Sequence, residues 1–326
     1  MNASLSIILN YYQVEKNIPY PKILATAEAF TQRYSYSYDL FLQGMAAGSG
    51  LTYGNCQILN AMETLGSLLT EEKSLGQCAF IALPPEKSYA NTTMIGRNYD
   101  FPPPYDLTAQ ELTLTILKEN NKIPTAIISM PGQIYCPSCI NQNGLFLELN
   151  NGEPSGGFTV ATDRKSLLIN MLEQLQNSPS LEALTSQLLA TQSDYSLIIN
   201  SANGMSARSF EFSSTLGMKT NFPPSGETFV STNFYLNTTW ADIPVPSDKT
   251  TWMGITRRDN LLNLADAQDT FTVSSFQQLM DKNISQGGAV WGLTIYQMIY
   301  DTGKDLYLKI TKNGGWVCLP LADWLS

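Results

Sequence analysis

The chain has 326 residues, 43% of them hydrophobic, and is long enough to form a sizeable core as one large domain or two small ones. Charged residues make up 14% of the sequence and give a net charge of −9 without a basic patch, which argues against a nucleic-acid or anionic-membrane partner. Histidine is absent, which excludes the Ser-His-Asp triad, the Cys-His pair and histidine-ligated zinc sites.

Residues 19–75 are predicted to be helical. Before them, the short apolar piece from Leu5 to Leu9 has neither a basic flank nor a small-residue cleavage site, so we see no signal peptide. The compartment stays open, and a secreted or periplasmic location would require that a signal sequence has been removed. Apolar residues at helical spacing predict helices over residues 20–34, 37–47 and 55–69.

From Cys78 onward, groups of short strands and amphipathic helices follow one another, and no run is long enough for a transmembrane helix. The order of helices, strands, helices and strands favours an α+β fold of stacked sheets with outer helices over a doubly wound parallel sheet. We expect helices over residues 163–175, 180–190, 256–266 and 274–282. We expect strands over residues 78–83, 94–100, 112–117, 125–129, 145–149, 195–199, 207–212, 228–231, 294–300, 306–310 and 316–319.

A predicted hairpin gathers a thiol, a cation and a carboxylate at its open end. Cys78 begins the first strand, and Arg97 and Asp100 lie near the end of the second. Without histidine, a thiol nucleophile needs another base, and one solution is its own α-amino group, exposed when the chain is cut just before it. That amine has an unperturbed pKa of roughly 7.7–8.0 and accepts a proton near neutral pH.

Five cysteines occur, and an odd number leaves at least one free thiol, for which Cys78 is the candidate. The sequence Cys136-Pro137-Ser138-Cys139 is a single CxxC motif without the second pair of a zinc site, and turn residues rather than a helix follow it. We therefore expect two ordinary thiols or a local disulfide in a loop. The sequence predicts no metal site and no cofactor.

Several ordered segments resemble the linear-amide branch of the N-terminal-nucleophile (Ntn) hydrolases, which includes isopenicillin N acyltransferase-like, acid ceramidase-like, choloylglycine hydrolase and penicillin V acylase proteins. Residues 41–50 with 57–63 are similar to the propeptide pattern of this family. Gly76-Gln77-Cys78 with residues 96–100 is similar to its cleavage-site cysteine and GRNxD strand. Residues 141–151 and 231–234 resemble its asparagine sites, and Arg257-Arg258 stands where it has a late arginine.

The resemblance implies a four-layer αββα sandwich of two stacked, mainly antiparallel sheets with outer helices. Residues 1–77 would form a helical propeptide or small subunit, and residues 78–326 the catalytic domain. The chain would cleave itself between Gln77 and Cys78, and the freed cysteine would attack a linear, non-peptide amide of an N-acyl substrate to form an acyl-enzyme.

The resemblance also implies a role for each site residue. Asp100 would orient the amine, and Arg97 would favour the thiolate. Asn150, chosen over Asn151, and Asn233 would donate hydrogen bonds to the oxyanion. Arg257, chosen over Arg258, would add a buried positive charge paired with a carboxylate.

Each residue also has a plain structural explanation: a core cysteine, an ion pair between Arg97 and Asp100 that stabilises a turn, and asparagines in turns. The ordered set of segments and the absence of histidine together favour the enzyme. An acyltransferase that passes the acyl group to an amine acceptor stays open, as does a non-catalytic binding protein on the same scaffold. The sparse charge and the aromatic residues at 99, 101 and 105 fit a small-molecule substrate with an apolar acyl group. We expect the cleaved N-terminal fragment to stay bound, and a homo-oligomer is compatible with the sequence.

Overall fold

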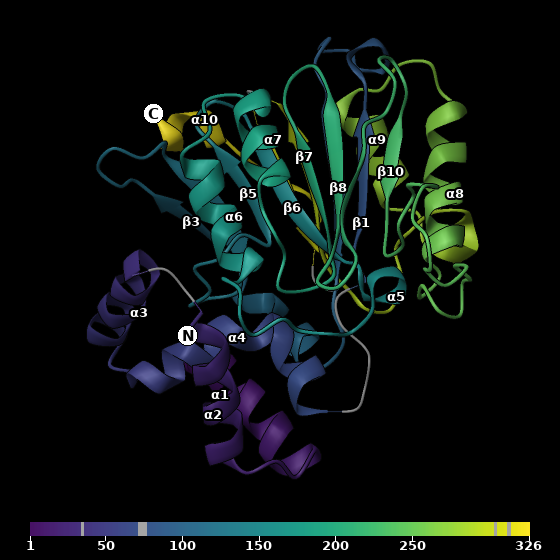
Figure 1. The fold of residues 1–326 in the computed structure, drawn as a ribbon. Helices are drawn as coiled ribbons and strands as arrows, with labels where there is room; N and C mark the ends of the chain where they lie inside the picture. Colours follow the sequence, from purple (N-terminus) through teal and green to yellow (C-terminus); the bar gives the residue numbers. More distant parts are fainter. Residues whose placement is uncertain (34–35, 71–76, 303–304, 312–313) are drawn as a thin grey trace.

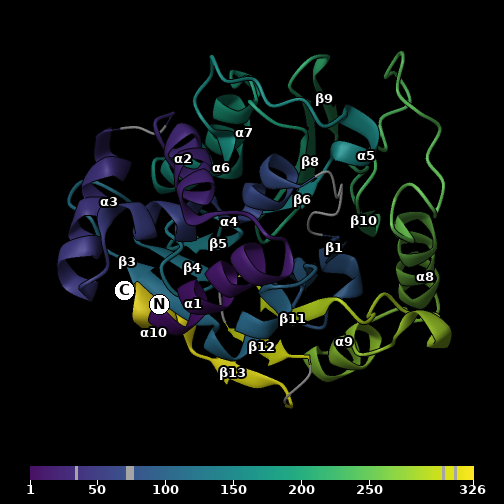
Figure 2. The ribbon, with the colours of Figure 1, turned by 90° about the horizontal axis from the view of Figure 1, so that it is seen from below.

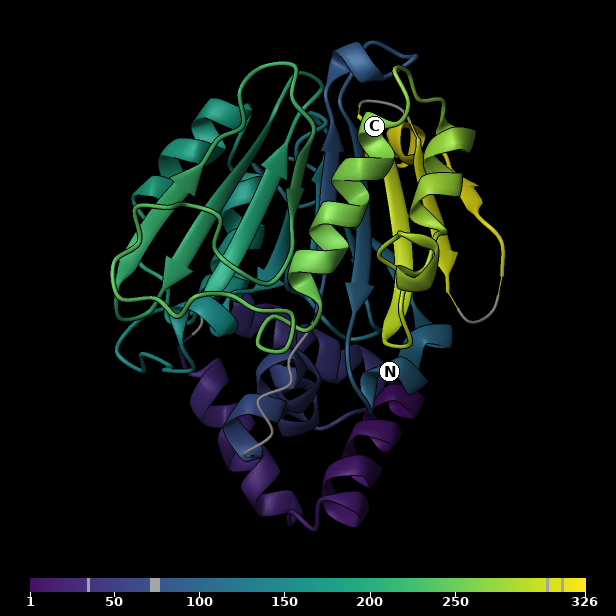
Figure 3. The same cartoon turned by 90° about the vertical axis from the view of Figure 1, so that its right-hand side faces the viewer.

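The computed structural model describes residues 1–33, 36–70, 77–302, 305–311 and 314–326. Tyr34, the predicted end of the first helix, and Gly76 of the predicted cleavage segment lie outside these residues. Within them, a six-stranded and a seven-stranded sheet stack face to face, with helices on the outer face of each (Figures 1 and 3). The predicted αββα sandwich is confirmed.

The six-stranded sheet contains the predicted hairpin, formed by its adjacent inner strands β1 and β2. Its strand order is β10-β1-β2-β11-β12-β13, and each neighbouring pair is antiparallel. Strands β1 and β2 are buried along their whole lengths, as expected for apolar central strands. The strands are β1 (Ala79–Leu83), β2 (Met94–Asp100), β10 (Phe229–Ser231), β11 (Thr294–Asp301), β12 (Leu306–Ile310) and β13 (Val317–Leu319).

The seven-stranded sheet is an antiparallel meander in which every strand pairs with the next along the chain. Two of its strands were not predicted, β5 and β9. Both are short and polar, and β5 holds its place because it pairs with a neighbour on each side. The strands are β3 (Thr113–Leu117), β4 (Thr125–Ser129), β5 (Ser138–Asn141), β6 (Phe146–Asn151), β7 (Leu197–Ala202), β8 (Ala207–Ser213) and β9 (Gly217–Asn221).

Two pairs of helices cover the outer faces. Helices α6 (Leu167–Gln176) and α7 (Leu181–Leu189) lie over the seven-stranded sheet, and α8 (Gly254–Asp266) and α9 (Val273–Met280) lie over the six-stranded sheet (Figures 1 and 3). The prediction started α6 four residues too early. Helix α9 packs closely on β2, because a Cβ at Gly96 would lie 2.7 Å from Sδ of Met280.

The N-terminal helices form a separate layer across one end of the sandwich (Figures 1 and 2). They are α1 (Asn2–Asn10), which was not predicted, α2 (Tyr20–Thr31), α3 (Tyr36–Ser49) and α4 (Tyr53–Leu69). Helix α4 is capped by the hydroxyl of Thr52, and its residues 56–65 are all buried. It therefore lies between the other N-terminal helices and the sheets.

The remaining helical pieces are short. None of the helices in the described part of the chain is long and apolar enough to cross a membrane. The short pieces are Tyr11–Glu15, Pro85–Lys87, Tyr105–Glu111, α5 (Glu153–Gly156), Ile284–Gln286 and α10 (Leu321–Leu325).

Candidate active site

The β1–β2 hairpin brings three predicted site residues together at the end of the sandwich that faces the N-terminal helices. Cys78 directly precedes β1, and β1 pairs antiparallel with β2. Side chains alternate between the faces of a strand, so Gly96 faces α9 while Arg97 points into the space between the sheets. Cys78, Arg97 and Asp100 are buried, with exposed fractions of 1%, 0% and 0%.

The guanidinium of Arg97 contacts the thiol. Its Nη2 donates to Sγ of Cys78 at 3.4 Å and to the carbonyl oxygen of Leu149. Its Nε lies 2.8 Å from Oε2 of Glu148 in β6, and both side chains are fully buried. Arg97 therefore links the thiol on one sheet to a carboxylate on the other.

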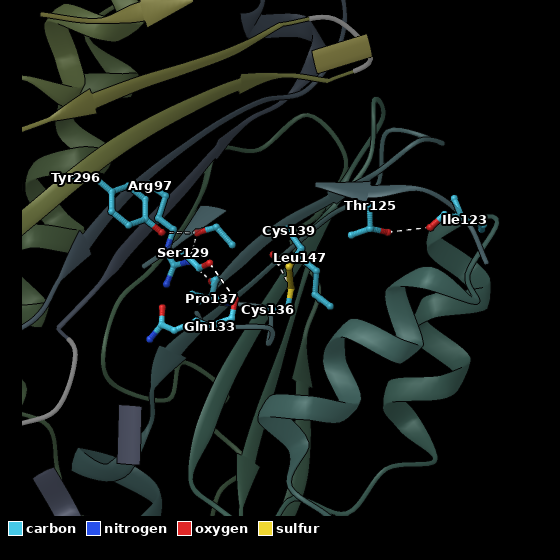
Figure 4. The surroundings of a disulfide bond; sticks show 11 residues. Arg97, Ile123, Thr125, Ser129, Gln133, Cys136, Pro137, Cys139, Leu147 and Tyr296 are labelled. Carbon is cyan, nitrogen blue, oxygen red and sulfur yellow. Dashed lines mark hydrogen bonds between the residues drawn. A yellow bond between two sulfur atoms is a disulfide. The ribbon is translucent and has the colours of Figure 1, made fainter. Parts of the chain in front are cut away.

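The third nitrogen of this guanidinium reaches the CxxC motif. Nη1 of Arg97 donates to the carbonyl oxygen of Pro137 and to the hydroxyl of Ser138. Cys136 and Cys139, on either side of these two residues, form a disulfide (Figure 4). The predicted placement of the motif in a loop is only half correct, because Ser138 and Cys139 belong to β5.

A second buried arginine lies at the carbonyl before the thiol. Nη1 of Arg257, in α8, donates to the carbonyl oxygen of Gln77 and, at 2.7 Å, to Oδ2 of Asp100. Since Arg97 pairs with Glu148 and Asp100 with Arg257, the alternative of a turn-stabilising pair between Arg97 and Asp100 is wrong.

The neighbouring arginine has a different environment. Arg258 pairs with Asp259 at 3.1 Å, and its side chain is 33% exposed. The structure therefore brings Arg257 to the Gln77–Cys78 bond and leaves Arg258 on the surface of α8.

The two predicted asparagines are both buried, and they take different positions. Oδ1 of Asn233 accepts from Nη2 of Arg257 at 2.9 Å, and its Nδ2 donates to the backbone oxygen of Asn151 at 3.0 Å. Asn150 lies on the same face of β6 as Glu148, because strand side chains alternate. With its amide in one orientation, Nδ2 lies 3.4 Å from the backbone oxygens of residues 231 and 232. With the amide turned over, which satisfies both of its ends, Nδ2 donates to Oε2 of Glu148 at 3.0 Å. Asn233 thus joins the site through Arg257, and Asn150 lines the space between the sheets.

Burial shifts the pKa of each titratable group in this cluster. It raises the pKa of the Cys78 thiol to about 12, although the Arg97 cation lowers it, so the thiol of the continuous chain is protonated at neutral pH. It raises the pKa of Asp100 to about 6, opposed by Arg257, and the pKa of Glu148 to about 7, opposed by Arg97. Both carboxyls therefore titrate near neutral pH.

Solved structures share this arrangement of stacked sheets. A conjugated bile acid hydrolase from Clostridium perfringens aligns with a TM-score of 0.53 and 13% identity over 76% of this chain and 93% of that chain. A Caenorhabditis elegans ortholog of N-acylethanolamine-hydrolyzing acid amidase aligns with a TM-score of 0.51 and 12% identity over 68% of this chain and 91% of that chain. The chain has the Ntn-hydrolase fold. No protein-family profile and no curated protein sequence matches it.

In this Ntn-hydrolase fold, the N-terminal helices close the space beside the thiol. The cavity next to Cys78 has a volume of about 20 Å³, which holds about one water molecule. Glu63 and Thr64 of α4 form one wall, and Leu149 and Asn151 form part of the opposite wall. A substrate larger than this cavity therefore cannot lie against Cys78 unless part of the cavity wall moves.

Sequence reasoning missed Glu148 as a member of this cluster. The signal was a single acidic residue in the apolar strand Phe146–Asn151, where alternation points it toward the core. A buried carboxylate requires a partner, and the partner is Arg97. Among the described residues, no group of three or more His, Cys, Asp or Glu side chains could hold a metal ion.

Proposed function

We propose that the chain is a self-processing amidohydrolase that cleaves the linear carbon–nitrogen bond of an N-acyl amide through the thiol of Cys78. The aligned proteins are named for hydrolysis of N-acylethanolamines and of conjugated bile acids, and this supports an amidohydrolase. The chemistry proposed for this chain rests on its own residues.

One observation carries the proposal: the two groups that self-cleavage would join are each contacted by a fully buried arginine. Sγ of Cys78 accepts from Arg97, and the carbonyl oxygen of Gln77 accepts from Arg257. A cation beside a thiol favours the thiolate, and a donor on a carbonyl oxygen stabilises the charge that develops there during attack. A cysteine that only fills the core needs neither contact.

Self-cleavage would begin with attack of the Cys78 sulfur on the carbonyl carbon of Gln77. The carbon–sulfur bond forms, the carbon–nitrogen bond breaks, and the nitrogen leaves as the α-amine of Cys78. Water then hydrolyses the thioester, giving residues 1–77 with a free carboxylate and a chain that begins at Cys78. Asp100, with a pKa of about 6, is ionised at neutral pH and can hold the new ammonium group.

Turnover would use the same thiol with a new base. The α-amine has an ordinary pKa of roughly 7.7–8.0 and would take the thiol proton, a role that no histidine can fill in this chain. The thiolate attacks the substrate carbonyl, the amine part leaves, and water releases the acyl group. Asn150 and Asn233 are the proposed oxyanion donors, and Arg257 supplies the nearby positive charge.

The small cavity beside Cys78 supports a role for residues 1–77 as a propeptide that remains attached. Helix α4 is buried along residues 56–65, so its apolar contacts would hold the fragment in place after the cut. Access for an acyl chain would require that part of the wall, such as α4, shift away from Cys78, because a cavity of about 20 Å³ holds no more than about one water molecule. Residues 78–326 would then form the catalytic domain.

The test is turnover of a panel of N-acyl amides with apolar acyl groups, joined to ethanolamine, glycine, taurine or a β-lactam nucleus. We expect amine release by the wild-type chain, none by Cys78→Ala, and an acyl adduct on the Cys78 peptide after acid quenching. Amine release that persists in Cys78→Ala would contradict the proposal. If the amine part is released only when a second amine is added, the chain is an acyltransferase and not a hydrolase.

A further inference from the structure

We propose that the Cys136–Cys139 disulfide is a positioning element that holds Arg97 against the thiol of Cys78. The importance of that thiol rests on the proposed function, but the contacts that carry this inference do not. The CxxC motif has no part in the chemistry proposed above, and the two residues between its cysteines accept hydrogen bonds from Arg97 (Figure 4).

The disulfide closes a small ring that contains two acceptors of Arg97. The Cα atoms of Cys136 and Cys139 are 5.5 Å apart, and both cysteines are fully buried. Between them, the carbonyl oxygen of Pro137 and the hydroxyl of Ser138 both accept from Nη1 of Arg97. The ring therefore fixes the two oxygens that orient one end of the guanidinium.

The two ends of this ring are held differently. Cys139 lies in β5, opposite Ile127 of β4 and Leu147 of β6, and Ser138 shares a hydrogen bond of 2.9 Å with the hydroxyl of Tyr296. Cys136 precedes the strand and belongs to the connection from β4. The disulfide is a second covalent tie, besides the backbone, between this connection and β5. Together with the hydrogen bond that the N–H of Leu149 donates at 3.4 Å, it holds the Pro137 carbonyl where Arg97 meets it.

Loss of the disulfide would let the positive charge of Arg97 move away from the thiol of Cys78. The other end of Arg97 faces the carboxylate of Glu148 at 2.8 Å, so a guanidinium released from the ring can turn toward that carboxylate. The attraction between a cation and a thiolate falls with distance, and Nη2 now lies 3.4 Å from Sγ of Cys78. The thiolate of Cys78 would then be less favoured.

The first measurement counts thiols. Alkylation with iodoacetamide in denaturant, without reductant, should modify three cysteines of the wild-type chain: Cys56, Cys78 and Cys318. Modification of all five cysteines in a preparation that cleaves itself at the wild-type rate would overturn the proposal.

The second measurement compares Cys136→Ala/Cys139→Ala with the control Cys318→Ala, which removes an exposed thiol outside the site. We expect the double variant to self-cleave up to about 100-fold more slowly, because small displacements of a catalytic group cost rates of this size. Ser138→Ala keeps the disulfide and loses one acceptor, so its loss should be smaller. The control should cleave at the wild-type rate.

The third measurement separates positioning from folding and from the proposed function. The rate of alkylation of Cys78 by iodoacetamide, a reagent much smaller than an N-acyl amide, is followed across pH by the mass of the Cys78 peptide. That mass also separates cut chains from uncut ones, so the variants are compared in the same form. The double variant should need a higher pH for half-maximal rate than the control. An unchanged midpoint, even with slower cleavage or a lower Tm, would make the disulfide merely structural and overturn the inference. If no form cleaves, the proposed function fails, while the midpoint still decides the inference.

Discussion

Two buried arginines flank the predicted cleavage site, and different parts of the molecule hold them. Arg97 pairs with Glu148 across the two sheets and contacts the thiol. Arg257 pairs with Asp100 between α8 and the six-stranded sheet and contacts the carbonyl oxygen of the preceding residue. The sulfur side of the site therefore depends on how the sheets stack, and the carbonyl side on how α8 docks.

A gain in folding stability does not explain why these two ion pairs are buried. Taking two charges out of water costs several kcal/mol per ion, and replacing a buried pair with apolar residues is often neutral or stabilising. Both pairs are nevertheless fully buried and lie beside the same peptide bond. This is the expected arrangement if the charges serve the chemistry of that bond.

The largest effect should follow from breaking the pair between the sheets. Arg97→Met leaves the Glu148 carboxylate buried without its cation, and we expect a loss of about 3–5 kcal/mol in the free energy of unfolding at pH 8. Denaturant unfolding of the chain in a Cys78→Ala background, which stays uncut, measures it. Adding Glu148→Leu should restore most of the loss. A double variant as unstable as the single one would contradict this account of the pair.

Breaking the other pair should act on the rate of self-cleavage. Arg257→Met removes the donor to the Gln77 carbonyl, and we expect cleavage to slow by about 100- to 1,000-fold, the usual cost of an oxyanion donor. The fraction cut with time, measured by intact mass, reports this rate. Arg258→Met is the matched control, since its side chain is partly exposed, and it should cleave normally. Equal rates for both variants would remove Arg257 from the mechanism.

The carboxylates of Glu148 and Asp100 should affect the free energy of unfolding over different ranges of pH. The pKa of Glu148 is raised from 4.5 to about 7 by burial, so between these values the folded chain binds more protons than the unfolded one. The free energy of unfolding should therefore fall as pH rises from 5 to 7, by about 2–3 kcal/mol from this residue.

Denaturant unfolding of uncut Cys78→Ala chains between pH 4 and 8 tests this. Glu148→Gln should flatten the slope between pH 6 and 7 more than Asp100→Asn does. The pKa of Asp100 is about 6, so most of its effect belongs at lower pH. Glu63, with a pKa also raised to about 7 by burial, keeps part of the slope in both variants. If the slope between pH 6 and 7 is the same in Glu148→Gln as in the parent chain, the carboxyl of Glu148 does not titrate in that range.

The smallest effect should come from Asn233. Asn233→Ala leaves one buried nitrogen of Arg257 without its acceptor. A buried donor without an acceptor lowers the free energy of unfolding by about 1–3 kcal/mol, and the arginine itself stays in place. Self-cleavage should therefore slow by less than in Arg257→Met. A variant slower than Arg257→Met would mean that Asn233 acts directly on the reacting atoms already in self-cleavage, and not only as the proposed oxyanion donor in turnover.

The sequence was sufficient to predict the stacked sheets and the hairpin, because short apolar strands and amphipathic helices have strong local patterns. It also singled out Arg97 and Asp100, with a mutual ion pair as the plain structural alternative, but it could not show their partners, each of which lies more than 50 residues away in the chain. Glu148 and strand β5 were missed because their places depend on neighbouring strands, which no local pattern reports. The disulfide was one of two alternatives, since spacing alone cannot decide whether two cysteines are oxidised.

The most direct test of the central claim is the intact mass of the purified chain after incubation at several pH values. We predict two fragments, of which the larger begins at Cys78, and a single full-length mass for Cys78→Ala. A wild-type chain that keeps its full-length mass throughout, or a cut at any other bond, would contradict the assignment of Cys78 as the nucleophile.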